Sequence, residues 1–597
     1  MKKSTIPIAP AMLIGLLSVI GDALTSVRRI VTMFLGIACI TTFIVISSPV
    51  VLHAQTEWKD NYVTLAVGDQ TNPAIAYPAT EAYTVIVWED IRDSVSSGTD
   101  IYAQKIDNSN GLPMWEPVDG VQVCTARGNQ SNPRAAYDSL GNIMVVWEDH
   151  RDHGTYASIY AQSLALPDGS VNANWSTDGE AVCDLRAHAE RPRIAGGRDG
   201  AFIAWVDWRN SSSMATDSSY RDIYLQYMVT STGSYPVGGN AAWASNGVLV
   251  PDTNIHDDTN VELARDFSWP KPADSTTNDG VMLVYESKRV ISATTSDSIY
   301  VVYADRFDAN GTRRWGDLRL ATYQEAQVLP QLEVLGRYHG IGDSVAVVVW
   351  QDMRPDPDPP VEYDIYSQHV SKHTGEVLGT PAGDVVCDQT AIQRYPVLSL
   401  YEREEDLGLS VSYLARVVCA WEDLRNAATH GVDLFAAVMD GVTCVLTNTA
   451  GTTGEEICTS TNDQMQVRVD NYGDDEMAYF VWRDGDDGGA DESDIWYQDM
   501  DLLTCYMYQS VGVGTAVTEA KGNQTNPQVG GDVFAWADKR RETILYDTQN
   551  DWNIYAETPG TCVGPTGMNW RDMWADVHPV GDAAQMRFAV DSAFNVF

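Results

Sequence analysis

A group of aromatic, acidic and basic side chains that could support proton transfer recurs along this chain. In its clearest form a tryptophan precedes Glu or Asp, a second Asp follows, and an arginine comes two residues later, as in Trp88, Asp90 and Arg92. Paired carboxylates beside an arginine can act as a general acid and a general base. An enzyme normally builds its active site once, whereas this group is repeated, so we predict a structural role instead.

In that role, each aspartate accepts hydrogen bonds from backbone N–H groups at a turn, and each arginine pairs with an acidic group of its own or the adjacent repeat. The large apolar rings of the tryptophans fill the space between repeats. The residues assigned to this structural repeat are Trp88, Asp90, Arg92, Trp147, Asp149, Arg151, Trp350, Asp352, Arg354, Trp421, Asp423 and Arg425.

Eight copies of the group divide most of the chain into similar units of about 55 to 80 residues. Within a unit, apolar alternation and turn residues indicate four short strands, and no segment keeps a helical period. Four strands repeated eight times predict an all-β fold, an eight-bladed β-propeller of four-stranded antiparallel blades. A β-solenoid or a string of separate sandwiches is the alternative, although solenoid coils are usually shorter. The copies centre on Trp88, Trp147, Trp205, Tyr285, Trp350, Trp421, Trp482 and Trp536.

A segment near the start of the repeats supplies a strand that the last unit needs. Residues 58–73 repeat the pattern of residues 115–133, which end one unit and begin the next. The earlier segment therefore has the form of a last strand without the three strands that should precede it. We predict that residues 61–67, at the N-terminus of the mature chain, complete the eighth blade by pairing within residues 525–560 and so close the ring.

The strand and turn sequences resemble those of known propeller families. Residues 87–92 and 100–104 are similar to the TolB-like repeats, in which a Ser/Glu-Asp-x-Arg turn leads into an Asp-Ile-Tyr strand. They are more similar still to repeats of large secreted and surface proteins of environmental bacteria, whose second half is matched by residues 107–124. The resemblance covers residues 58–560 and implies a β-propeller. It implies no particular activity, because those families are mostly uncharacterised binding or structural modules.

The chain is strongly acidic, with 82 Asp and Glu against 39 Lys and Arg and a formal net charge of −43. Phosphate backbones carry the same sign, so this composition excludes nonspecific nucleic-acid binding. Such a charge favours cations, basic surfaces or solubility alone.

The N-terminal segment differs from the acidic remainder. Residues 1–54 place a basic pair at 28–29 before an apolar run that ends near Ala54. This order is typical of a signal peptide cleaved after Ala54, and the length of the apolar run also allows an uncleaved membrane anchor. We therefore expect a secreted protein, extracellular or at the cell surface. Disulfides can form there, and Cys444 and Cys458 could join across a hairpin or remain free buried thiols.

The densest acidic stretch lies at residues 483–494, between the second and third strands of the seventh unit. Carboxylates interspersed with glycines suit calcium, which takes about six to eight oxygen ligands in flexible geometry. The spacing is not that of an EF-hand, and a solvated acidic loop is the alternative. The candidate calcium ligands are Asp484, Asp486, Asp487, Asp491, Glu492 and Asp494.

These features divide the chain into a signal peptide or anchor (1–54), a propeller (55–562) and a C-terminal extension (563–597). The extension is too apolar for a free tail, and residues 586–591 alternate like a strand. It must pack on its own propeller or on another subunit. In the second case we expect a homo-oligomer or a filament.

The sequence favours a non-catalytic extracellular protein with a structural, self-assembling or adhesive role, as part of a filament or surface layer. It contains no Gly-x-Ser-x-Gly, His-Glu-x-x-His or P-loop motif. The alternative is a propeller that binds or hydrolyses a glycan or peptide in a central funnel. A convergent cluster of unrepeated polar residues would favour this alternative, and subunit contacts through the extension would favour assembly.

Overall fold

The described part of the chain belongs to one compact unit of the computed structural model. The predicted signal peptide or anchor and the predicted C-terminal extension lie outside the described residues. The structure describes residues 61–64, 66–78, 82–152, 154–211, 220–237, 241–251, 257–266, 280–290, 298–323, 325–336, 345–354, 362–406, 411–448, 450–471, 476–485, 493–507, 514–518, 522–531, 533–540 and 551–557.

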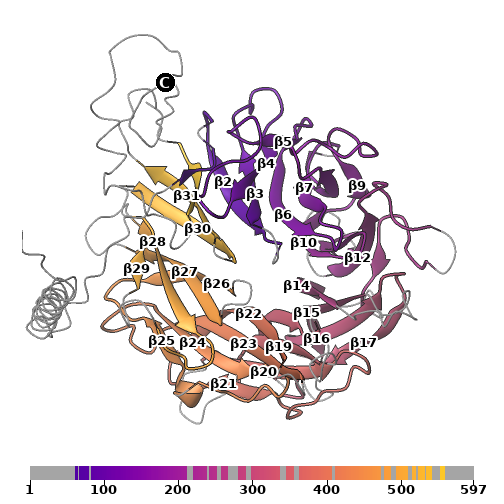
Figure 1. Ribbon diagram of the computed structural model, residues 1–597. Coiled ribbons are helices and arrows are strands. Elements are labelled where there is room, and N and C mark those ends of the chain that lie inside the picture. Colours follow the sequence, from indigo (N-terminus) through magenta and orange to yellow (C-terminus); the bar gives the residue numbers. More distant parts are fainter. Residues whose placement is uncertain are drawn as a thin grey trace, which may run out of the picture. The chain divides into compact units, whose positions relative to one another are not determined.

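The described residues form antiparallel sheets from consecutive strands, so the predicted all-β class is confirmed (Figure 1). One 3-10 turn, η2 (Gly451–Thr453), accompanies them, and none of the described elements is an apolar helix of membrane-spanning length. Six sheets have four strands each. They comprise β2 (Gln70–Ala76), β3 (Tyr83–Asp90), β4 (Asp100–Asp107) and β5 (Val121–Cys124); β6 (Gln130–Tyr137), β7 (Ile143–Asp149), β8 (Ser158–Leu164) and β9 (Glu180–Cys183); β10 (Ala189–Gly196), β11 (Gly200–Asp207), β12 (Asp222–Val229) and β13 (Val248–Leu249); β14 (Asp257–Asp266), β15 (Gly280–Val290), β16 (Ser298–Asp308) and β17 (Arg313–Arg319); β18 (Gln327–Val334), β19 (Val345–Asp352), β20 (Asp364–Ser371) and β21 (Asp384–Cys387); β22 (Gln393–Asp406), β23 (Val411–Asp423), β24 (Asp433–Asp440) and β25 (Glu455–Cys458).

The remaining strands form an eight-stranded sheet made of two antiparallel groups. The groups are joined by one parallel pairing, between Ser493 and Asn523. In the second group β1 pairs with β32, with Asn61 opposite Ala556, inside the range where the sequence places the partner of residues 61–67. The strands are β26 (Gln464–Asn471), β27 (Met477–Gly485), β28 (Ser493–Asp501) and β29 (Thr515–Ala516), and then β30 (Gly522–Gly530), β31 (Val533–Arg540), β32 (Asn553–Glu557) and β1 (Asn61–Tyr62).

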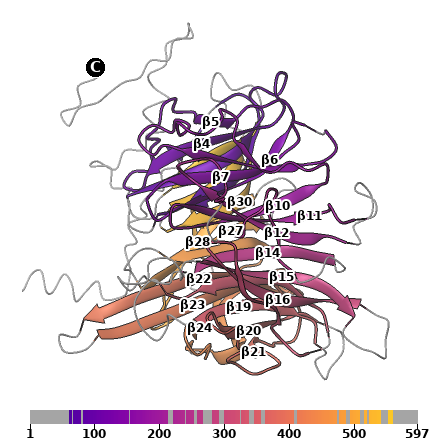
Figure 2. The same ribbon diagram turned by 90° about the vertical axis from the view of Figure 1, so that its right-hand side faces the viewer.

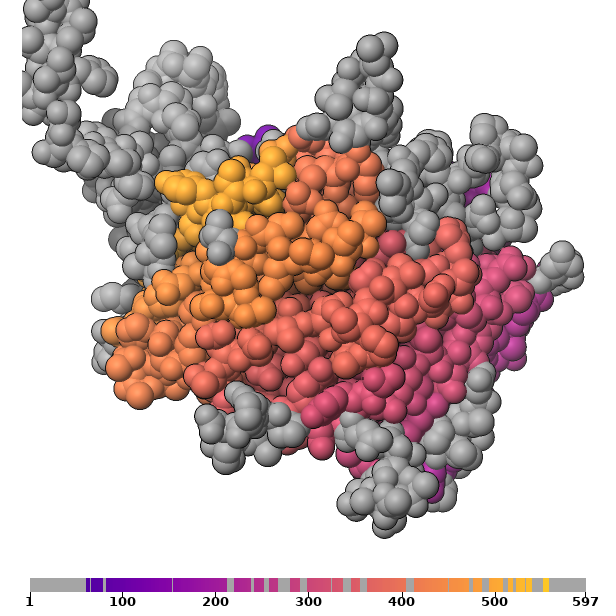
Figure 3. Space-filling model, turned by 90° about the horizontal axis from the view of Figure 1, so that it is seen from below, coloured from indigo at the N-terminus to yellow at the C-terminus, as the bar shows by residue number. Residues whose placement is uncertain are grey.

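The strand that comes first in each four-stranded group, here called the first strand, lies next to the first strands of the neighbouring groups. Contacts run in chain order from β2 to β6 and onward to β30, and β30 contacts β2. Both ribbon views show the groups following one another in this order (Figures 1 and 2). In the space-filling view, the same order runs across the visible face from magenta to yellow (Figure 3). The fold is therefore β-propeller-like.

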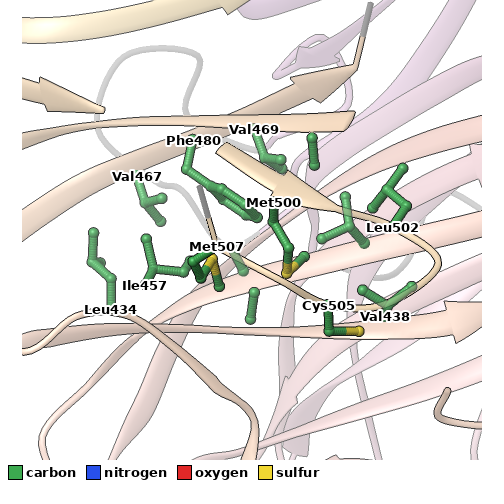
Figure 4. Packing of buried hydrophobic residues seen from close by; sticks show 14 of the residues in the cluster. Leu434, Val438, Ile457, Val467, Val469, Phe480, Met500, Leu502, Cys505 and Met507 are labelled. Atoms are coloured by element: carbon green, nitrogen blue, oxygen red, sulfur yellow. The ribbon is translucent and has the colours of Figure 1, made fainter. Parts of the chain in front are cut away.

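The core lies between consecutive groups of strands. Figure 4 shows one example, in which Leu434 and Ile457 of one group pack against Val467, Phe480 and Met500 of the next. A similar buried cluster joins each successive pair, and one of them joins β31 and β32 to β3 and β4. Full burial of such a side chain stabilises the fold by about 1.5–3 kcal/mol, so most of the packing energy resides between the groups.

Of the two alternatives that the sequence leaves open for Cys444 and Cys458, the structure has no disulfide between them, and both side chains are buried. Cys458 lies opposite Leu434, at the start of β24, whereas Cys444 follows the other end of that strand. The strand alone separates them by about 20 Å, far beyond the reach of a disulfide. They also belong to different apolar clusters.

Candidate functional site

The repeated Trp-x-Asp-x-Arg group closes the end of the second strand in most groups. In the first sheet, Trp88 Nε1 donates to Asp90 Oδ2 at 2.9 Å, and Asp90 Oδ1 accepts the backbone N–H of Arg92 at 2.9 Å. The Arg92 guanidinium forms an ion pair with this carboxylate at 2.6 Å and lies 3.9 Å from the ring centroid of Tyr102. Both oxygens of Asp90 are bonded, which leaves this carboxylate no free oxygen for acid–base chemistry. The same bonds join Trp147, Asp149 and Arg151; Trp205, Asp207 and Arg209; Trp350, Asp352 and Arg354; and Trp421, Asp423 and Arg425.

The group also holds the loop that precedes the fourth strand. Arg92 donates to the carbonyl of Asp119 at 2.7 Å. The next residue, Gly120, has a φ of 91°, and a Cβ there would lie 2.4 Å from Cη2 of Trp88. Glycine is therefore required at this position both for the backbone conformation and for contact with the tryptophan.

The glutamate of the group bonds the following sheet instead of a substrate. Glu89 Oε1 accepts the backbone N–H of Asn132 on β6 at 2.7 Å, and Glu148 Oε1 accepts that of Arg191 on β10 at 2.6 Å. Burial raises the pKa of Glu89, while its hydrogen bonds to Asn72 and Asn132 oppose that rise. Sequence reasoning missed this role, because the acceptor and the donor lie in different repeats. Glu286, Gln351 and Glu422 make the equivalent bond to Leu329, Tyr395 and Gln466.

The seventh group of strands departs from the pattern at the predicted calcium site. Asp484 takes the place of the repeated aspartate, and its carboxylate accepts bonds from Asn462 at 3.0 Å and Gln464 at 3.3 Å. Asp494 lies opposite it on β28. No group of three or more His, Cys, Asp or Glu side chains suited to a metal occurs among the described residues. Asp484 is thus engaged in the repeat, and the other candidates, Asp486, Asp487, Asp491 and Glu492, lie outside the described residues.

Each first strand contains a β-bulge with one residue in the left-handed backbone region. In β6, for example, the register shifts between Ser131 and Arg134, and Asn132 has a φ of 53°. Asparagine tolerates this conformation, whereas a bulky side chain is strained by about 1–3 kcal/mol. The bulge residues are Asn72, Asn132, Arg191, Asn260, Leu329, Tyr395, Gln466 and Asn526.

Two residues after the bulge, three first strands carry an arginine and one carries a glutamate. We call Arg134, Arg193, Glu262 and Arg468 the arginine cluster. Arg193 forms an ion pair with Glu262 at 2.8 Å. Burial, followed by the charge of Arg193, lowers the pKa of Arg134 to about 10, and the charge of Arg468 acts in the same direction. The four residues occupy the same position of their first strands, β6, β10, β14 and β26.

Two guanidinium groups of the cluster have few partners. Arg134 donates to the carbonyl of Pro133 at 2.8 Å, and Arg468 donates to the carbonyl of Val467 at 2.9 Å. Within the described residues, no ion pair joins either arginine to a carboxylate. Many protein atoms surround Arg468, and solvent nevertheless reaches its side chain. A guanidinium has five N–H donors, so most donors of both groups can reach a ligand.

A second set of unrepeated side chains lies farther along the first strands. We call Glu333 on β18, Glu402 on β22 and Asp470 on β26 the carboxyl cluster. Asp470 accepts bonds from the backbone N–H groups of Gly531 and Asn471 at 3.0 and 2.9 Å. Glu402 accepts the N–H of Gly336 at 3.0 Å.

Glu333 is different, because none of the described residues hydrogen-bonds its side chain. Burial, with the charges of Asp470 and Glu402, raises its pKa to about 8. Its carboxyl group therefore holds a proton at neutral pH and can donate a hydrogen bond.

An exposed aromatic ring occupies one bulge. Tyr395 on β22 is 53% exposed and has a φ of 54°, a costly conformation for a bulky side chain. The Arg394 guanidinium lies 5.3 Å from its ring centroid. The left-handed conformation belongs to the repeat, whereas the exposed ring beside a cation is particular to this bulge and offers a flat surface for stacking.

The two clusters and Tyr395 are the residues that sequence reasoning missed. Their signal is a change of residue type at a constant position in the repeat, as in the Pro133–Arg134 and Pro192–Arg193 pairs after the bulges. Alignment of the eight units on their bulges would have exposed it. Together these residues can bind an anion, stack on an apolar face and donate a proton.

No protein-family model and no curated protein matches the sequence. Among solved structures, the Dos1 propeller has a TM-score of 0.39 and 10% identity, covering 83% of this chain and 94% of that one. The polysaccharide lyase Uly1 has a TM-score of 0.35 and 10% identity, covering 74% and 91%. A protein of unknown function from Dyadobacter fermentans has a TM-score of 0.32 and 9% identity, covering 74% and 97%. These similarities are too low to bear on activity.

Proposed function

We propose that this protein is a non-catalytic extracellular β-propeller that binds an anionic glycan, through the arginine cluster, at the centre of its first strands. One observation carries the proposal: among the described residues no carboxylate forms an ion pair with Arg134 or Arg468, although the charge of Glu262 acts on both. Guanidinium groups match carboxylates and sulfate esters in geometry and charge.

Electrostatics support an exchangeable anion. The three guanidinium groups and one carboxylate of the arginine cluster carry a net positive charge, which Glu148 and Glu422 offset only in part, in a chain whose overall charge is −43. Burial lowers the pKa of Arg134, and repulsion by the like charges of Arg193 and Arg468 lowers it further. A bound anion would offset the repulsion and supply acceptors for the free N–H groups.

Two further side chains on the first strands favour a sugar as the bearer of that anion. Tyr395 offers an exposed ring for stacking on the apolar face of a pyranose. The protonated carboxyl group of Glu333 offers a donor to a hydroxyl or acidic oxygen. An acidic glycan combines all three requirements.

The proposal includes an eight-bladed ring. We assign β26–β29 and β30–β32 with β1 as two blades, and the pairing of β1 with β32 as the closure. Contact between β30 and β2 supports the same assignment. In a ring of eight blades, the eight bulges would lie at the same height along the ring axis. Each bulge would then offer a position for a side chain that contacts the ligand.

Convergence of unrepeated polar residues supports ligand binding over the assembly role. A filament or surface layer built through residues 563–597 stays a prediction from the sequence, because that segment lies outside the described residues.

The test is binding of defined glycans by isothermal titration calorimetry, with sulfated and uronic-acid oligosaccharides beside neutral ones of equal length. We expect only the acidic glycans to bind. The double variant, Arg134→Gln with Arg468→Gln, should bind them at least tenfold more weakly. The matched control is Arg127→Gln with Arg186→Gln, because both of these arginines are exposed and the pair of substitutions removes the same two positive charges. Equal binding of neutral glycans, or unchanged affinity in the double variant, would overturn the proposal.

A further inference from the structure

Glu262 is the acidic member of the arginine cluster, and it is bonded to one of the three arginines. Its Oε1 accepts a hydrogen bond from Nε of Arg193 at 2.8 Å, and among the described residues no other side chain bonds it. The pair joins neighbouring first strands, because β10 contacts β14. The side chains of Arg193 and Glu262 are 29% and 27% exposed, so solvent reaches both partners.

The charge of Glu262 also acts on the other two arginines of the cluster. Burial, followed by the charge of Arg193, lowers the pKa of both Arg134 and Arg468, and the charge of Glu262 opposes that shift in each. Glu262 therefore interacts with all three guanidinium groups, with one through a direct ion pair and with two through its charge.

The three arginines are held in the same way on their strands. Each donates from Nη1 to the carbonyl of the residue before it, at 2.8 to 3.4 Å, and each occupies the same position after the bulge. What distinguishes Arg193 from the other two is its carboxylate partner. Without that partner, its guanidinium would offer donors to a ligand as the others do.

We propose that Glu262 takes the place of the ligand's acidic group, so that it occupies Arg193 in the free protein and is displaced when an acidic glycan binds. This inference rests on the proposed function and adds to it an internal competitor that sets the affinity of the site. A glutamate carboxylate offers a guanidinium group the same acceptor atoms as a uronic acid. Ion pairs that solvent reaches contribute little to stability, so the exchange of one acceptor for another costs little.

The other carboxylates whose charges act on the cluster are bonded outside it. Glu148 accepts the backbone N–H of Arg191 at 2.6 Å, and Glu422 pairs with Arg394 at 2.9 Å. The bond of Glu262 lies within the cluster. Glu262 is thus the carboxylate that an incoming anion would have to displace.

Displacement predicts how affinity depends on charge. The cluster has three guanidinium groups and one carboxylate, and Glu262→Gln removes the negative charge among them. At about 10 Å and an effective dielectric of about 20, one unit charge changes the affinity for a singly charged anion roughly tenfold. The repulsion is proportional to the charge of the ligand, so a more acidic sugar should gain more.

The experiment measures, by isothermal titration calorimetry, the binding of chondroitin disaccharides with one and with two sulfate groups to the full chain. The variants are Glu262→Gln, which keeps the shape and loses the charge, and Glu262→Gln with Arg193→Gln, which removes the pair. The matched control is Glu476→Gln. Glu476 pairs with Arg403, is 23% exposed, and is not among the leading charges that act on the other two cluster arginines.

We expect Glu262→Gln to bind the monosulfated sugar about tenfold more tightly than the wild type, with a larger gain for the disulfated sugar. The double variant should bind within about threefold of the wild type, because a guanidinium group and its competitor are lost together. Glu476→Gln should bind as the wild type does. Circular dichroism checks that each variant is folded, and the double variant carries the test if Glu262→Gln does not fold.

Unchanged or weaker binding by Glu262→Gln would show a purely structural ion pair. The same gain in Glu476→Gln would show an effect of total charge, and a tenfold loss in the double variant would show that Arg193 binds without a competitor. Each of these results would overturn the inference and leave the proposed function standing. Absence of binding by both the wild type and Glu262→Gln would overturn both.

Discussion

The first strand and the second strand each keep the same backbone from group to group, but their sequences differ in how much they vary. At the end of the second strand, the same tryptophan, aspartate and arginine recur with the same bonds, as around Asp90 and Asp149. Two residues after the bulge of the first strand, the backbone is equally constant and the side chain changes. That position holds Ala74, Arg134, Arg193, Glu262, Gln331, Val397, Arg468 and Gln528.

This difference distinguishes two requirements on a repeat protein, which are the stability of each group and the binding of a ligand. Each group must close its own turn and pack on the next, so the residues that do this are the same in most repeats. A ligand at a shared centre is contacted once by each group and needs different chemistry from each. Changes in the second strand should therefore affect stability, and changes in the first strand should affect binding.

The largest expected effect is the loss of a repeated aspartate. Asp149→Ala removes the acceptor of Trp147 Nε1 and Arg151 N and leaves the Arg151 guanidinium unpaired. We expect a loss of about 3–5 kcal/mol in the free energy of unfolding, measured by guanidinium denaturation. Asp484→Ala should cost less, about 1–3 kcal/mol, because hydrogen bonds alone are lost. The reverse order would contradict the role assigned to the repeated ion pair.

The second effect concerns pH and the free energy of unfolding. The folded state keeps the Glu333 proton between its ordinary pKa of 4.5 and about 8, and the unfolded chain loses it near 4.5. Wild-type stability should therefore fall as the pH rises through this window. Glu333→Gln should remove about 2–4 kcal/mol of that fall, seen in urea denaturation at pH 4, 7 and 9. Parallel stability curves for the two proteins would contradict the raised pKa.

The smallest effect concerns the glutamate that bonds the following sheet. Glu148→Ala leaves the N–H of Arg191 without its acceptor and should cost about 1–2 kcal/mol in the free energy of unfolding. Acidic-glycan affinity should change much less than in the arginine variants, because Glu148 bonds the backbone of Arg191 and its charge is only a minor influence on Arg134. Glu376→Ala, at an exposed site, is the control and should change neither quantity. A large loss of affinity with unchanged stability would contradict the assignment of stability to the second strand and of binding to the first strand.

Much of the fold follows from local patterns in the sequence. Alternation and turn residues predict the strands, and the likeness of residues 58–73 to 115–133 points to the pairing that β1 makes with β32. The bonds of Asp90 are local, within two residues, and the pattern predicts them.

The site could not be predicted in the same way, because it depends on distances between repeats. Arg134 and Arg468 lie more than 300 positions apart, and neither has an unusual local sequence. The alternatives left open for Cys444 and Cys458 show the converse, because residues that are close in sequence need not be close in space. Cys444 and Cys458 lie near opposite ends of one strand. Calcium at residues 486–492 stays a prediction.

The pairing of β1 with β32 also has a mechanical consequence. The strands are antiparallel, so the chain enters at Asn61 beside Ala556, close to where it leaves after Glu557. Tension applied through the two ends would load these hydrogen bonds one after another, as in unzipping, and not all at once, as in shear. The short two-residue strand would then detach at low force, before the longer strands behind it.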